Sequence, residues 1–71
     1  MWYEVHFVVN KPFEVDGISK TEVSFYDHDN ARAFAKKMTT CADVIGDVCV
    51  LNGTTGEVLD IYVEGESVYT V

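Results

Sequence analysis

Only one segment of this chain has the hydrophobic periodicity of an amphipathic helix, and that limits how a sheet built from the rest can be covered. Apolar residues recur there at i, i+3, i+4 and i+7, namely Ala31, Phe34, Ala35 and Met38. Asp27 precedes this stripe as an N-cap, and the helix is expected to end near Thr39 and Thr40. Because one helix covers one face of a sheet, the other face must lie open.

The remaining apolar segments alternate with the period of strands. In the segment from Tyr3 to Val9 the odd positions are all apolar, which places them on the core face and Trp2, Glu4, His6 and Val8 on the opposite face. Further strands are expected at 20–26, 48–51, 57–63 and 67–71. The predicted fold is therefore α+β, one domain over residues 1–71, with an antiparallel-rich sheet of about five strands and one helix on one face. The expected order is strand, strand, helix, strand, strand, strand.

The segment VLNGTTGEVL contains two glycines that a phosphate-binding loop would also use. A phosphate loop requires a helix after it and usually a lysine near its end, whereas here a strand follows and no cation is near. Gly53–Gly56 instead fits a four-residue hairpin turn, with Gly56 left-handed and Asn52 bonded to the loop amides. This turn sets Val50 opposite Leu59 and Val48 opposite Ile61.

Two other turns are predicted. Asp16–Gly17 suits a tight turn between the first two strands, but a two-residue turn there would pair odd positions with even ones. A bulge near Lys11–Pro12 is predicted to correct this parity, and a wider loop is the alternative. Gly65–Glu66 is predicted to turn the chain into the last strand, which would oppose Val63 with Val68 and Tyr62 with Tyr69.

The charge is strongly acidic and unevenly distributed. The net charge is −7, and all five basic residues precede position 39. The second part of the chain holds only acids: Asp43, Asp47, Glu57, Asp60, Glu64 and Glu66. Binding to nucleic acid needs cations, so direct nucleic-acid binding is not expected. A basic protein surface is the better partner, although acidic charge also serves solubility alone.

The expected compartment is the cytoplasm. No apolar run approaches the ~20 residues that span a bilayer, so no membrane partner is expected. The first residues read directly as a strand without a basic leader, which indicates no signal peptide. Cys41 and Cys49 are then expected to be reduced thiols.

The uncovered face is predicted to combine aromatic and aliphatic side chains with carboxylates. Exposed patches of this kind on small proteins often mark contact sites. The alternative is that long polar side chains and sheet curvature hide much of it. The residues predicted to bind a partner are Trp2, Glu4, His6, Asp47, Asp60, Tyr62, Glu64 and Tyr69.

Candidate chemistry is weak by comparison. His6 with nearby carboxylates resembles an acid–base set, but an exposed sheet lacks a water-excluding pocket. Asp27, His28 and Asp29 are residue types that bind metals, but the side chains of adjacent residues at a helix start point in different directions, so a metal cluster is not expected there. Cys49 beside His6 is more simply a structural cysteine. No enzyme is expected, and no catalytic, cofactor or metal residue is assigned.

Two function classes therefore remain. The first is a non-enzymatic binding or inhibitory module that presents an acidic, aromatic sheet face to a basic site of a nucleic-acid-binding enzyme. Its concrete form would be a phage- or mobile-element-type inhibitor that acts partly as a DNA mimic, which is an analogy of size and acidity alone. The second is a structural domain that self-associates, with a homodimer as the expected form. A small-molecule or metal site near His6 or His28 is a third, weaker option.

Overall fold

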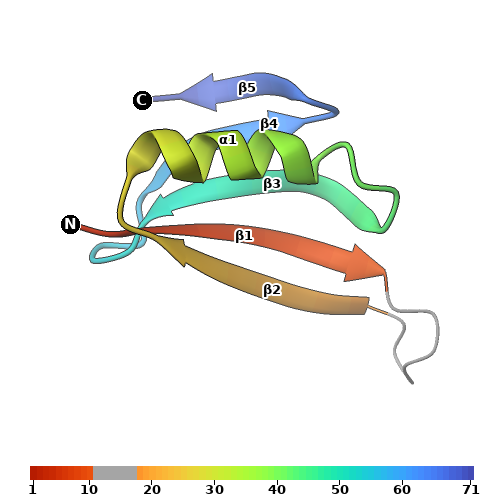
Figure 1. The fold of residues 1–71 in the computed structure, drawn as a ribbon, viewed down its shortest axis with the longest axis horizontal. Helices are drawn as coiled ribbons and strands as arrows, with labels where there is room; N and C mark the ends of the chain where they lie inside the picture. Colours follow the sequence, from red (N-terminus) through yellow and green to blue (C-terminus); the bar gives the residue numbers. More distant parts are fainter. Residues whose placement is uncertain (11–17) are drawn as a thin grey trace.

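The chain forms a five-stranded antiparallel sheet with one helix lying across one face (Figure 1). This computed structural model describes residues 1–10 and 18–71. The strand order is β2-β1-β3-β4-β5, so the helix connects β2 at one edge to β3 beyond β1. The predicted α+β fold and element order are confirmed, and the element bounds are β1 (Tyr3–Asn10), β2 (Ile18–Phe25), α1 (His28–Met38), β3 (Val44–Asn52), β4 (Val58–Val63) and β5 (Glu66–Thr70).

The helix forms where the stripe predicts it. Asp27 is the N-cap, and its side chain accepts a hydrogen bond from the backbone N–H of Asp29 over 3.3 Å. Lys36 and Lys37 lie in the last turn, where the helix dipole favours cations, and Thr39 is the C-cap. The helix found in the described residues is not long and apolar enough to cross a membrane.

The core lies between α1 and the sheet. The odd positions of β1 face the helix, as the alternation predicts, and the small Ala31 and Ala35 let the helix approach the strands closely. Phe34 extends the contact over β1 and β2 by packing against the rings of Phe7 and Phe25. The fully or nearly buried residues of this cluster are Val5, Phe7, Ala31, Ala35, Val48, Val50 and Tyr62.

The register of β1 with β2 resolves the parity problem. Tyr3 pairs with Phe25 and Val5 with Val23, so odd positions oppose odd ones without a shift through β1. This register places the apolar sets of both strands on the helix side. The bulge predicted near Lys11–Pro12 and the turn predicted at Asp16–Gly17 lie outside the described residues.

The loop between β3 and β4 is the hairpin turn that the sequence predicts. Gly56 has a φ of 76°, in the left-handed region. The Asn52 side-chain oxygen accepts hydrogen bonds from the backbone N–H groups of Thr54 (2.9 Å) and Thr55 (3.2 Å). The Gly56 N–H closes the loop on the Asn52 carbonyl over 2.7 Å. These bonds satisfy the loop backbone internally.

The predicted pairing beyond this loop is wrong. Leu51 pairs with Val58, but Val50 then pairs with Asp60 instead of Leu59. The register shift leaves Leu59 as an extra, buried residue on β4. Since side chains alternate along a strand, the bulge places every later residue of β4 on the face opposite to the one that the sequence predicts.

The turn between β4 and β5 lies one residue earlier than predicted. Val63 pairs with Glu66, so Glu64 and Gly65 form the turn. Both have positive φ, 50° and 79°, as a type I′ hairpin turn requires. A second register shift follows between Ile61 and Tyr62. The predicted opposition of Val63 with Val68 and of Tyr62 with Tyr69 is therefore wrong.

Replacing Glu64 with Asn is expected to stabilise the protein by about 0.5–1 kcal/mol, because Asn tolerates the left-handed region better and Asn-Gly is a favoured type I′ pair. Chemical denaturation of both proteins measures the gain. Glu57→Asn removes the same charge outside the positive-φ position and is the control. An equal gain in the control would mean that charge reduction, not turn geometry, stabilises the variant.

Candidate interaction face

The sheet face opposite α1 carries a row of side chains contributed by all five strands. Directly opposed residues on neighbouring strands project from the same face. The row runs in order across the sheet through Glu22, His6, Cys49, Ile61 and Tyr69. We call this helix-free surface the open face.

The same register assigns the other members of the open face. Ser24, Glu4, Leu51 and Val58 form a second row, Lys20, Val8 and Ile45 form a third, and Val63 pairs with Glu66 near the end of the β4–β5 hairpin. The apolar members are largely half-buried, while Ile45 (45%) and Tyr69 (46%) are exposed. The open face is thus apolar along β3 and β4, with charged groups concentrated towards β2.

A pocket of ≈ 260 Å³ opens on this face between β2, β1 and β3. It lies where the pairing of β1 with β3 shifts between His6 and Val8, close to Gly46, whose φ is 75°. The shift is a strand irregularity of the β-bulge type, and Asp47 beside it lines the pocket together with Cys49. The side chains that line it include His6, Val8, Lys20, Glu22, Asp47 and Cys49.

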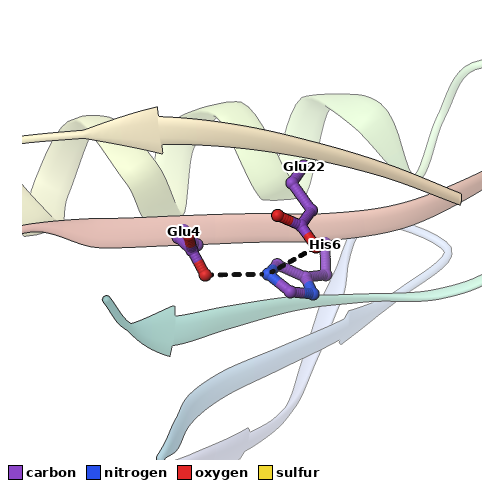
Figure 2. A group of neighbouring side chains, drawn as sticks. All are labelled: Glu4, His6 and Glu22. Carbon is purple, nitrogen blue, oxygen red and sulfur yellow. Dashed lines mark hydrogen bonds and ion pairs between the residues drawn. The ribbon is translucent and has the colours of Figure 1, made fainter. Parts of the chain in front are cut away.

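His6, one of the pocket residues, lies between the carboxylates of Glu4 and Glu22, as Figure 2 shows. Its Nε2 is 3.1 Å from Oε1 of Glu4, two residues earlier on the same face of β1. The same nitrogen is 3.9 Å from Oε1 of Glu22, the direct partner of His6 on β2. Because antiparallel pairing fixes all three backbone positions, this group is a consequence of the β1–β2 register.

Cys49 is half-buried beside His6 and carries a free thiol. Burial raises the pKa of the Cys49 thiol, and the negative charge of Asp47 raises it further. No hydrogen bond joins Cys49 to His6 within the described ranges. The Cys49 thiol is therefore protonated at neutral pH, as expected of a structural cysteine.

Asp60 and Tyr62, two of the predicted partner-binding residues, do not lie on the open face. Tyr62 belongs to the core cluster under α1, and Asp60 is only 1% exposed on the same side. The bulge at Leu59 reverses their orientation, so Ile61 and Val63 take the open-face positions instead. The face assignment of Asp60 and Tyr62 is wrong, and the open face is more apolar and less acidic than predicted.

Asp60 instead accepts hydrogen bonds at the helix–sheet interface. Arg32 Nε and Thr70 Oγ1 each donate to Oδ1 over 3.1 Å, and His28 Nε2 lies 2.7 Å from Oδ2. His28 also stacks on the Tyr3 ring, with centroids 4.6 Å apart. Burial acts to raise the pKa of Asp60, but the hydrogen bonds from His28, Arg32 and Thr70 outweigh it and lower that pKa. This polar cluster around the buried Asp60 joins α1 to β4 and β5.

The other predicted residues are distributed as follows. Glu4, His6, Asp47 and Tyr69 lie on the open face, whereas Glu64 forms the β4–β5 turn. Trp2, just before the start of β1, packs its ring against Gly53, and the Gly53 N–H donates to the Trp2 carbonyl over 2.8 Å. The prediction omitted Glu22, since its place beside His6 depends on a register that the sequence did not determine.

No protein-family model, no curated protein and no solved structure matches this chain. The residues of the open face, with their contacts and charges, are therefore what points to a function.

Proposed function

We propose that this protein is a small, non-enzymatic binding module whose open face docks on a basic surface of a partner protein. The observation that carries the proposal is the chemistry of that face. Half-buried apolar side chains from β3 and β4 lie there, on the side that α1 does not cover, next to the carboxylates of Glu4, Glu22 and Asp47. Apolar surface left open on a small protein marks contact sites, and carboxylates beside it select cationic partners.

Charge complementarity favours a basic partner over a second copy of this chain. Each copy carries a net charge of −7, so two open faces brought together would repel each other. The molecule measures 36 × 23 × 16 Å along its principal axes, and a stable interface uses about 800 Å² from each partner. A partner would therefore occupy most of the open face.

The specific form we propose is an inhibitor of the kind that phages and mobile elements employ. It would occlude the basic nucleic-acid site of an enzyme, partly by imitating DNA. An apolar face flanked by carboxylates suits a site that offers both cations and base-stacking surface. The same proposal places the protein in the cytoplasm, where the free thiols Cys41 and Cys49 stay reduced.

Self-association through β5 is the second candidate, and the exposure of this edge strand favours it. Val68 is 60% exposed and Tyr69 46%, and every residue of β5 is exposed. Natural edge strands usually carry charges or cover, because open edges pair with other chains. Here the partner would be the β5 strand of a second copy, giving a homodimer.

Affinity capture from a lysate of the source cell tests the first candidate with two variants of equal net charge. Glu22→Lys combined with Asp47→Lys reverses two charges on the open face. Glu57→Lys combined with Glu64→Lys reverses two charges in the loops at either end of β4. We expect wild type and the loop variant to retain the same basic protein, and the open-face variant to lose it. Retention should also weaken at high salt.

Equal binding by all three proteins would contradict docking through the open face. Equal loss in both variants would mean that net charge alone drives capture, as expected of a protein whose acidity serves only solubility. Sedimentation of the wild type completes the test. A concentration-dependent dimer that captures no basic protein would favour pairing through β5.

A further inference from the structure

We propose that Glu4, His6 and Glu22 form a binding site on the open face for a divalent first-row transition metal of the Zn²⁺ class. Three potential ligand atoms, one from each residue, all lie within 4.8 Å of one another. They come from two paired strands (Figure 2), and His6 and Glu22 also line the pocket. The site goes beyond the proposed binding function and does not depend on it.

The distances are close to those of a coordination shell. Zn²⁺ binds imidazole nitrogen and carboxylate oxygen at about 2.0–2.2 Å, which places tetrahedral ligands about 3.4 Å apart. His6 Nε2 lies 3.1 Å from the Glu4 oxygen and 3.9 Å from the Glu22 oxygen. Small rotations of the side chains therefore bring the three atoms around one ion, without movement of the strands.

The donor set selects the class of metal. Imidazole suits Zn²⁺ and its neighbours in the first row, whereas Ca²⁺ prefers six to eight oxygen ligands. Three protein ligands leave at least one position for water or for a group from outside the chain. The pocket beside His6 offers room for that fourth ligand, and Asp47 and Cys49 line it.

Local electrostatics also favour a cation. Glu4 is half-buried, with its side chain 23% exposed, and Glu22 is 63% exposed. A bound divalent ion would neutralise both carboxylates. Among the described residues that line the pocket, Lys20 is the one basic side chain. The competing arrangement is a protonated His6 paired with the two carboxylates, which needs no metal.

Zn²⁺ titration of the metal-free full chain, followed by NMR, separates these arrangements. The chain has two histidines, so the ring signals of His6 and His28 report on two different places. We expect one Zn²⁺ per chain and a shift of the His6 ring signals, while those of His28 stay unchanged. Calorimetry should show that Glu4→Gln with Glu22→Gln lowers the affinity at least about tenfold, a loss that even outer-shell changes cause. His6→Gln should do the same.

Glu57→Gln with Glu64→Gln removes the same charge away from the site and should bind Zn²⁺ like the wild type. The proposal is overturned by unchanged His6 signals at excess Zn²⁺, or by equal losses in both double variants. If the site variant does not fold, Glu22→Gln alone keeps the test, because that side chain is largely exposed. A failure here leaves the capture experiment untouched, since that experiment uses no added metal.

Discussion

Replacing His28 with Leu and Arg32 with Met together is expected to lower the free energy of unfolding by about 3–5 kcal/mol, the cost of leaving a buried charge without its partners. Among the described residues, Asp60 would keep the Thr70 hydroxyl as its one side-chain donor, while its own side chain is 1% exposed. For a chain of this length the total stability is on the order of 4–10 kcal/mol. The double variant should therefore be marginal or unfolded at neutral pH.

Adding Asp60→Leu to this double variant should restore most of the lost stability, because a buried ion cluster is often replaceable by apolar residues of similar volume. Urea denaturation followed by circular dichroism measures all three proteins. Asp47→Leu in the same double variant is the control, since Asp47 lies on the open face. If Asp60→Leu restores no more than this control, the buried carboxylate is not the source of the loss.

Measuring stability as a function of pH tests the role of Asp60 a second way, by comparing the wild type with the triple variant. The folded pKa of Asp60 is lowered, so its contribution is present above the unfolded pKa of an aspartate and is lost as pH falls through the folded value. The stability of the wild type should fall in this range by more than that of the triple variant. Parallel curves would show that Asp60 contributes nothing to acid sensitivity.

The fold class was predictable because its signals are local. The cap at Asp27 and the apolar stripe of the helix depend on neighbouring residues alone, and so does the Asn52–Gly56 turn. The bulge at Leu59 and the register shift in β5 have no such signal, because an extra residue on one strand depends on how two strands pack. These irregularities decide which residues of β4 and β5 face the helix.

The candidate site was predictable in part for the same reason. Glu4 and His6 share a face by simple alternation, so their proximity follows from the sequence. Glu22 joins them only through the register of β1 with β2. One signal was missed: Asp60 interrupts an apolar strand, and the helix offers His28 and Arg32 at i and i+4, a spacing that points both at one neighbour.

Replacing Gly53 with Ala is expected to destabilise the protein by about 1–3 kcal/mol, the usual cost of overpacking. A Cβ at Gly53 would clash with Cδ2 of the Trp2 indole, so the ring would have to move. Trp2 is the single tryptophan of the chain, and its fluorescence reports that displacement directly. We expect red-shifted emission together with a lower melting temperature.

The effect of Gly53→Ala on stability should change sign when Trp2 is absent. Gly53 does not adopt a positive φ, so Ala fits its backbone conformation once the ring is removed. In a Trp2→Ala background, Gly53→Ala should stabilise the protein by about 0.4–1 kcal/mol, because Ala restricts the unfolded chain more than Gly does. The four proteins form a double-mutant cycle. An equal cost of Gly53→Ala in both backgrounds would place the effect in the loop backbone, whereas a reversed sign would assign it to the contact between Trp2 and Gly53, which fixes the end of β1 on the β3–β4 hairpin.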